Sequence, residues 1–231
     1  MGLTRQASVA FPGKIVYNTL MKKKIVFIGN SIVNGFPLSR GKSFPGQIRA
    51  WVKEGSVPFR ADVINKGANG ETTAQIVERF FHDVLAHEPA AVFILSGTND
   101  FIYREATPRQ AFAHMEAMAG QAQARGIVPV YMTPLPVDAA KASRMWMAGV
   151  GIDYDAVNDQ VEEFTQLLQS GGRLVIDTGA AFRQYADGLR EAGEEAYHDG
   201  VHPTAEGYRF LAETTADWIS RNTVTLQLEE S

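Results

Sequence analysis

Short apolar runs alternate along the chain with segments whose apolar residues recur every three or four positions. Five such runs predict strands, at residues 25–28, 61–65, 92–95, 127–132 and 174–177. Most are continuous runs of valine, isoleucine, leucine and phenylalanine, which is the pattern of parallel strands covered on both faces. The pattern therefore predicts a mostly parallel sheet with a layer of helices on each side.

The segments between and after these strands carry helix signals. The helix that follows Thr107 has proline at its first position and glutamine at its third, and Thr72 with Gln75 forms a second capping pair. Apolar residues at helical spacing mark two more helices, over 157–168 and 208–219. Alternating strands and helices form right-handed βαβ units. We therefore expect an α/β fold with three layers, α/β/α.

The 231 residues fit a single domain, with no internal repeat and no linker rich in proline, glycine or serine. We expect this domain over residues 21–221. Residues 1–20 are interpreted as an N-terminal extension, with an ordered N-terminal segment as the alternative. Residues 222–231 form a C-terminal tail in which the alternating stretch 223–228 suggests an edge strand, of the kind that a chain can donate to a partner subunit. A tail that packs on its own domain, or frays, is the alternative.

Composition narrows the functional classes. The formal net charge of −4 provides neither a basic face for nucleic acid nor a polybasic membrane patch. No apolar run approaches the ~18 residues of a membrane span. The absence of cysteine excludes disulfides, thiolate nucleophiles and cysteine-ligated metals. Pro12 and Gly13 interrupt the short apolar stretch near the start, which makes a poor signal peptide, so we expect a cytoplasmic location. Whether the protein is a homo-oligomer stays open.

Three residues far apart in the chain suggest a chemical function. Ser31 lies at the end of the first apolar run, and Asp199 and His202 lie three positions apart near the C-terminus. A hydroxyl nucleophile, an imidazole base and an orienting carboxylate are the parts that serine hydrolysis needs. Two more polar blocks, residues 65–72 and 96–100, directly follow predicted strands. Because the carboxyl ends of parallel strands carry the site in open α/β sheets, we expect all these blocks at one edge.

These blocks resemble those of the SGNH hydrolases, also called GDSL esterases or lipases. Residues 29–32, Gly-Asn-Ser-Ile, resemble the nucleophile block, with Asn30 where many members have aspartate. Gly70 stands in an Asn-x4-Gly-x-Thr pattern, residues 97–100 resemble the Gly-x-Asn-Asp block, and residues 199–203 resemble the Asp-x-x-His block. One block alone would be weak, but four in family order, over about residues 21–219, make a specific match.

The resemblance implies a flavodoxin-like, five-stranded sheet in the order 2-1-3-4-5 and a carboxylic ester hydrolase that needs no cofactor or metal. It implies that Ser31 is the nucleophile, His202 the general base and Asp199 its orienting partner. It implies an oxyanion hole formed by the N–H groups of Ser31 and Gly70 and the side-chain amide of Asn99. The expected partner is a small-molecule ester. A histidine base predicts a neutral-to-alkaline activity optimum.

The sequence is less informative about the substrate. We expect short-chain or acetyl esters, because the domain leaves no room for a large lid; lipase, acetylesterase and thioesterase activities are the family's alternatives. Phe101 and Tyr103 follow the asparagine block, and Trp146 lies in a long apolar connection after the fourth predicted strand. We expect these three residues to line the substrate pocket. The alternative is that Trp146 fills a secondary core.

Several of these residues also have structural interpretations. Ser31 could cap the helix that follows the strand. Asp100 is expected to bond neighbouring backbone groups rather than to take part in chemistry. The remaining histidines within helix patterns are expected to have surface or packing roles: His82, His87 and His114.

Two other functional classes remain open. His198, Asp199 and His202 could ligate the metal of a metal-dependent hydrolase, which a chelator would inactivate. The same fold could also serve as a non-catalytic ligand-binding module, which would not react with a fluorophosphonate. A serine hydrolase should be labelled by that reagent at Ser31.

Overall fold

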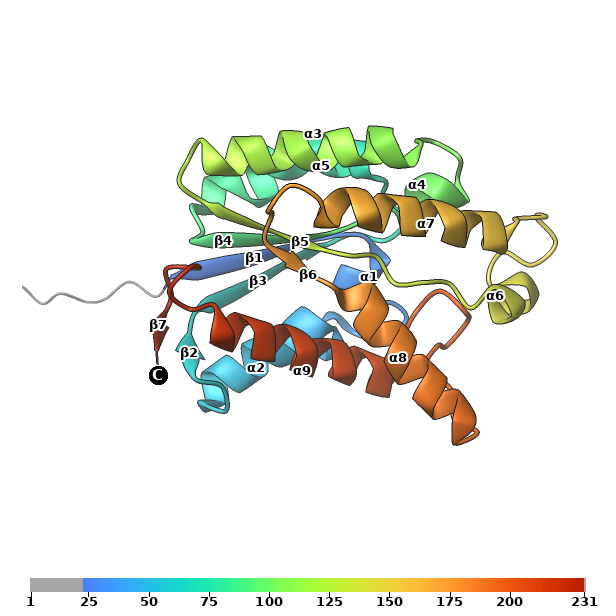
Figure 1. Ribbon diagram of the computed structural model, residues 1–231. Helices are drawn as coiled ribbons and strands as arrows, with labels where there is room; N and C mark the ends of the chain where they lie inside the picture. The colour runs from blue at the N-terminus through green and yellow to red at the C-terminus, as the bar shows by residue number, and fades with distance from the viewer. Residues whose placement is uncertain (1–22, 231) are drawn as a thin grey trace, which may run out of the picture.

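The computed structural model describes residues 23–230, which form a three-layer α/β/α sandwich (Figure 1). The central strands are β1 (Lys24–Gly29), β3 (Asp62–Gly67), β4 (Ala91–Leu95), β5 (Val128–Met132) and β6 (Val175–Ile176). They lie in the order β3-β1-β4-β5-β6, and every neighbouring pair is parallel. Counted in chain order within this sheet, the order is 2-1-3-4-5, so the expected fold class is confirmed. The extension expected over residues 1–20 lies outside the described residues.

Within residues 23–230, six long helices cover the two faces of the sheet. One face carries α3 (Thr73–Asp83), α5 (Pro108–Gln123) and α7 (Tyr154–Gln169); the opposite face carries α2 (Phe44–Glu54), α8 (Thr178–Glu191) and α9 (Ala205–Arg221) (Figure 1). The shorter segments are α1 (Ser31–Asn34), η1 (Arg40–Lys42), η2 (Leu85–His87), α4 (Thr98–Ile102) and α6 (Ala139–Met145). Among the described residues, no helix has both the length and the apolar character that crossing a membrane requires.

The sheet separates two hydrophobic cores. Phe27 of β1 and Phe93 of β4 stack at 4.6 Å between ring centroids and face α2 and α9. Val26 and Ile28 alternate with Phe27 and face α3 and α5 on the other side. All four side chains are fully buried. The continuous apolar runs of the sequence therefore reflect strands whose two faces are both covered.

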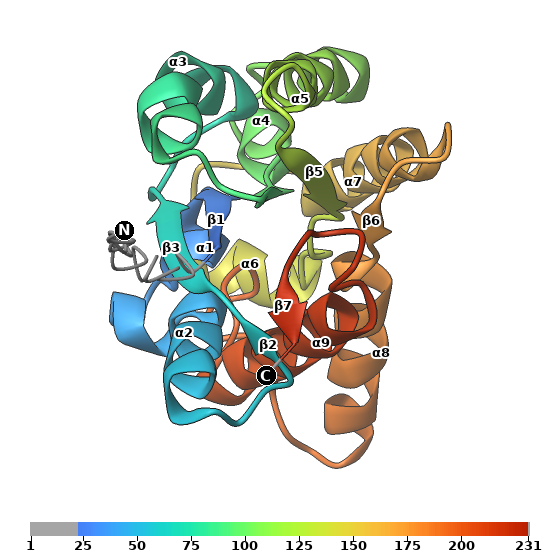
Figure 2. The same ribbon diagram turned by 90° about the vertical axis from the view of Figure 1, so that its left-hand side faces the viewer.

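The C-terminal tail packs on its own domain, which is one of the alternatives that the sequence left open. Residues 222–227 form turns, and the alternating pattern at 223–228 arises because Leu226 and Leu228 are buried against the core. Strand pairing begins only after residue 228, where β7 (Glu229–Glu230) pairs antiparallel with β2 (Phe59–Arg60) of the same chain. Figure 2 shows β2 and β7 side by side, away from the main sheet.

Candidate active site

The turn after β1 presents Ser31 at the carboxyl edge of the sheet. Gly29 ends the strand, and a Cβ there would lie 2.1 Å from the carbonyl oxygen of Leu95, so only glycine fits. The side chain of Asn30 caps α1 by accepting the N–H of Ile32 at 3.1 Å. Asn30 is therefore the capping residue, and the side chain of Ser31 is free of the capping role that the sequence left open.

The structure brings the three candidate triad residues into one hydrogen-bonded chain. His202 Nε2 lies 2.9 Å from Ser31 Oγ, and His202 Nδ1 lies 2.8 Å from Asp199 Oδ2. The exposed fractions of Ser31, Asp199 and His202 are 6%, 6% and 1%. Asp199 Oδ1 also accepts the N–H groups of Val201 and His202, at 3.0 and 2.8 Å. The short loop thus fixes the relative position of carboxylate and imidazole by its own backbone.

The charge of Asp199 determines which imidazole nitrogen carries the proton. Burial alone would raise the pKa of this carboxyl, but hydrogen bonds from the His202 side chain and backbone hold it below its ordinary value. Asp199 is therefore ionised at neutral pH and accepts from Nδ1–H of His202. The lone pair of Nε2 then faces Ser31 and can accept the hydroxyl proton.

Helix α6 holds the loop that carries Asp199 and His202. Gly200, with φ of 94°, lies so close to α6 that a Cβ would approach the Ala142 nitrogen to 2.3 Å. The N–H of Asp138 donates to the carbonyl oxygen of Gly200 at 2.8 Å. The buried ammonium of Lys141 donates to the carbonyl oxygen of Tyr197 at 2.7 Å. Together these contacts hold the loop against the first turn of α6.

Two aromatic rings flank the imidazole of His202. The ring centroids of Trp146 and Phe36 lie 4.6 and 4.7 Å from that of His202, both in edge-to-face orientation. The carbonyl oxygen of Trp146 accepts the hydroxyl of Tyr154 at 2.7 Å, which anchors the end of α6 to α7. Sequence patterns did not indicate Phe36, because it lies in a tight turn between Gly35 and Pro37, where no periodicity applies.

The candidate oxyanion donors come from the ends of three strands. Asn99, in α4 after β4, donates one amide hydrogen to the carbonyl oxygen of Glu71 at 2.9 Å. Gly70 precedes Glu71 in the loop after β3, so this bond joins the two blocks. Ser31 and Asn99 line one cavity. The second amide hydrogen of Asn99 is available to a ligand oxygen.

The cavity beside Ser31 is small and its walls are mainly apolar. Its volume is about 10 Å³, and its apolar lining comes from Ile32, Leu95, Pro134, Leu135, Val137 and Val201. A space of this size holds about one water-sized group. Ser96 also lines it, is 1% exposed and has a hydroxyl without a hydrogen-bond partner in the described part of the chain.

The three residues expected to line the pocket have different positions. Trp146 contacts the imidazole, as described above. The hydroxyl of Tyr103 lies 3.9 Å from the position that a Cβ would take at Gly70, next to the oxyanion block. The structure contradicts the prediction that Phe101 lines the pocket. Phe101 is 1% exposed and packs edge-to-face on Phe164 of α7, so it belongs to the core. It follows Asn99 by two positions, which turns its side chain toward α7.

The proposed metal ligands do not gather around a common point. Asp199 and His202 bond each other, and His202 bonds Ser31. Within residues 23–230, no group of three or more histidine, aspartate or glutamate side chains has a metal-binding arrangement. The metal-dependent alternative therefore lacks a ligand set in this part of the chain.

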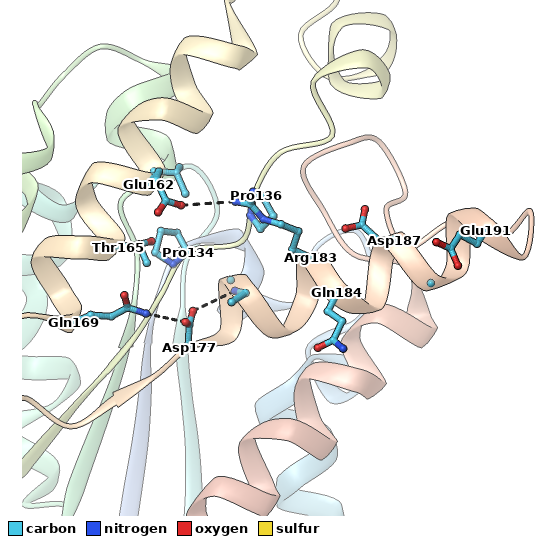
Figure 3. A pocket seen from close by; sticks show the side chains of 14 residues that line it. Pro134, Pro136, Glu162, Thr165, Gln169, Asp177, Arg183, Gln184, Asp187 and Glu191 are labelled. Atoms are coloured by element: carbon cyan, nitrogen blue, oxygen red, sulfur yellow. Dashed lines mark hydrogen bonds and ion pairs between the residues drawn. The ribbon is translucent and has the colours of Figure 1, made fainter.

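A wide groove of about 610 Å³ runs between α7 and α8 (Figure 3). Four of its side chains form two pairs: Gln169 donates to Asp177 at 2.7 Å, and Arg183 lies 3.9 Å from Glu162. None of the triad residues lines it. We therefore assign the candidate active site to the edge that carries Ser31, not to this larger groove.

Comparison with known proteins gives consistent results. A profile of the GDSL-like Lipase/Acylhydrolase family matches residues 27–210. The chain is 24% identical over 212 residues to an acetylxylan esterase of Geobacillus stearothermophilus, covering 82% of this chain and 90% of that protein. It is 26% identical over 220 residues to an acetylxylan esterase of Xylanibacter ruminicola, covering 84% of this chain and 42% of that longer protein.

Solved structures share the fold. The lipase/acylhydrolase from Enterococcus faecalis superposes with a TM-score of 0.70 at 21% identity, covering 90% of this chain and 98% of that one. The G. stearothermophilus acetylxylan esterase superposes with a TM-score of 0.65 at 21% identity, covering 85% and 94%.

Proposed function

The chain belongs to the GDSL-like lipase/acylhydrolase family, and from this premise we propose that it is a serine esterase for short-chain acyl or acetyl esters. At the family level it is a carboxylic ester hydrolase, as its acetylxylan esterase relatives indicate. The observation that carries the finer proposal is the hydrogen-bonded chain from Asp199 through His202 to Ser31, with links of 2.8 and 2.9 Å.

The proposed reaction has two halves. Ser31 Oγ attacks the ester carbonyl carbon while its proton moves to His202 Nε2. The tetrahedral intermediate then collapses, His202 gives the proton to the leaving alkoxide, and the acyl group stays on Ser31. Water activated by His202 releases the acid and restores the serine. Asp199 stays ionised throughout and stabilises the imidazolium that forms in each half.

We assign the alcohol side of the ester to the space beside Trp146 and Phe36. Their rings flank the imidazole that must return a proton to the leaving alkoxide. Tyr103, next to Gly70, borders the oxyanion side. The acyl side then falls in the small cavity behind Ser31.

Replacing Asn99 with alanine tests the oxyanion hole. The kcat of the variant should fall about 10²–10³-fold, because one donor to the oxyanion disappears. This corresponds to an activation barrier about 2.7–4 kcal/mol higher. Steady-state kinetics on an aryl acetate measures this effect. Asn222→Ala is the matched control, since the Asn222 amide also bonds a backbone carbonyl, that of Trp218 at 2.8 Å, but at the far end of α9. An Asn99→Ala rate close to that of the control would remove Asn99 from the hole.

Enlarging the cavity behind Ser31 tests the acyl preference. Because this cavity is small, the proposed acyl site should favour an acetyl group, and kcat/KM should fall from acetyl to hexanoyl esters. Leu135→Ala removes part of the wall and should raise the hexanoyl-to-acetyl ratio of kcat/KM about tenfold or more. Leu211→Ala, a buried leucine of α9 outside this cavity, should leave the ratio unchanged. An unaltered ratio in Leu135→Ala would place the acyl group elsewhere.

A further inference from the structure

Three separate loops supply the proposed oxyanion donors, and helix α3 is bonded to all three. Ser31 follows β1, Gly70 follows β3 and Asn99 follows β4. An oxyanion hole works only when its donors are held within about 0.5 Å of their productive positions. Sheet pairing fixes the strands but not the loops beyond them. The contacts of α3 show what holds those loops together.

The first link joins α3 to α4, the helix that carries Asn99. The carboxylate of Asp100 is fully buried and accepts the N–H of Thr73 at 3.0 and 3.2 Å. The Thr73 hydroxyl donates to Asp100 Oδ1 at 2.6 Å and also lies 2.8 Å from His114 Nδ1 of α5. Asp100 directly follows Asn99, and Thr73 lies three positions after Gly70. This α3–α4 link therefore joins the segments that bear two of the proposed donors.

The second link joins α3 to the end of β1. The guanidinium of Arg79 donates to the carbonyl oxygen of Gly29 at 3.1 Å, two residues before Ser31. Its Nε donates to the carboxylate of Glu71 at 2.7 Å, directly after Gly70. Asp83, one turn further along α3, binds a third nitrogen of Arg79 at 2.6 Å and keeps the guanidinium in place. This α3–β1 link therefore joins the turn of Ser31 to the loop of Gly70.

We propose that Thr73, Asp100 and Arg79 are positioning residues that set the spacing of the three oxyanion donors through these two links. The inference rests on the proposed esterase function. None of the three is assigned a contact with substrate. Each acts through a neighbour: Asp100 and Thr73 through Asn99 and Gly70, and Arg79 through Ser31 and Gly70.

The expected effect is on turnover rather than on substrate binding. Donors of this kind act because they are already in place when charge develops on the oxygen. A displacement of about 1 Å can cost on the order of 10²-fold in rate. Loosening either link should therefore lower kcat about 10- to 100-fold, while KM stays within about threefold.

The experiment compares variants that remove a link with variants that spare it. Thr73→Val removes the hydroxyl at nearly constant shape, and Thr73→Ser keeps a hydroxyl. Arg79→Met removes the α3–β1 link. Arg173→Met is its control, because Arg173 also forms a partly buried ion pair, with Glu116 at 2.7 Å, but away from the active-site edge. Active sites are counted by complete reaction with a fluorophosphonate, and kcat is expressed per reactive serine, so that unfolded protein does not count as lost activity.

We expect Thr73→Val and Arg79→Met to lose at least tenfold in kcat per reactive serine with KM little changed. Thr73→Ser and Arg173→Met should stay within about twofold of the parent protein. If Thr73→Val and Arg79→Met both keep the parent kcat, or if Thr73→Ser falls as low as Thr73→Val, the inference is wrong while the esterase proposal stands. If the parent protein itself has no reactive serine and hydrolyses no ester, both fail.

Discussion

Ser31→Ala is expected to lower kcat for ester hydrolysis roughly 10⁴- to 10⁶-fold, the loss seen when the nucleophile of a serine hydrolase is removed. No other hydroxyl bonds His202 Nε2 among the described residues, so nothing there replaces Ser31 as nucleophile. The fold should persist, because Asn30 rather than Ser31 caps α1. Steady-state kinetics with an activated acetyl ester measures the loss, and circular dichroism monitors the fold.

Ser220→Ala is the matched control for this substitution. The Ser220 hydroxyl also forms a hydrogen bond, donating to the carbonyl oxygen of Ala216 at 2.7 Å, but it lies near the end of α9 and outside the active-site cavity. Its removal should leave kcat within about threefold of the parent value. A Ser31→Ala variant that keeps more than about 1% of the parent kcat would show that the reaction does not need this hydroxyl.

Asp199→Asn should lower kcat about 10⁴-fold at neutral pH, with little change in KM. The new amide can donate to His202 Nδ1, which stabilises the tautomer whose proton sits on Nε2. That nitrogen then cannot accept the proton of Ser31. The amide oxygen can still accept the N–H groups of Val201 and His202, so the loop should keep its shape.

The same variant should change the acid stability of the protein. The pKa of Asp199 is lower in the folded state than its ordinary value, so the carboxylate stabilises the fold above that ordinary value. This contribution disappears as the pH falls through the folded-state pKa, and Asp199→Asn should lack it. Asp177→Asn, which alters the aspartate that caps α8, is the control. An Asp199→Asn enzyme with more than about 10% of the parent kcat at pH 7 would contradict the orienting role.

Much of the fold was predictable because buried strands appear in the sequence as continuous apolar runs. The apolar run at 25–28 corresponds to β1 (Lys24–Gly29), and the run at 92–95 corresponds to β4 (Ala91–Leu95). Both were recognisable because both strands are apolar on both faces. Thr72 and Thr107 marked helix starts because their capping boxes are local interactions between residues three positions apart.

Helices α2 and α8 could not be predicted as readily. Helix α2 has proline and glycine in its first turn and buries only Phe44, Pro45 and Ile48. Helix α8 lies at the sheet edge and contains Gly179 and Gly188, so its apolar stripe is thin. Few large side chains of either helix are fully buried, so neither segment contains a long apolar run that the sequence analysis would single out.

The residues of the candidate site were predictable where they belong to short motifs with a fixed spacing. They were not predictable where tertiary packing alone brings a side chain to the site. Four short motifs identified Ser31 and its proposed partners. Trp146 was expected near the pocket, but the contact of Phe36 with His202 depends on the path of its loop, and Phe101 is turned toward α7 instead of the site. The sequence indicated that Asp100 bonds backbone groups but not which ones, because its partner Thr73 lies 27 positions away. The bond of Arg79 to Gly29, which spans 50 positions, was not indicated.

The central claim is that Ser31 is a nucleophile activated by His202. Its most direct test is mass spectrometry of the protein after reaction with a fluorophosphonate, followed by peptide mapping. The account predicts one adduct per chain, on Ser31, and none in Ser31→Ala. No adduct on the parent protein, or an adduct that survives in Ser31→Ala, would contradict it.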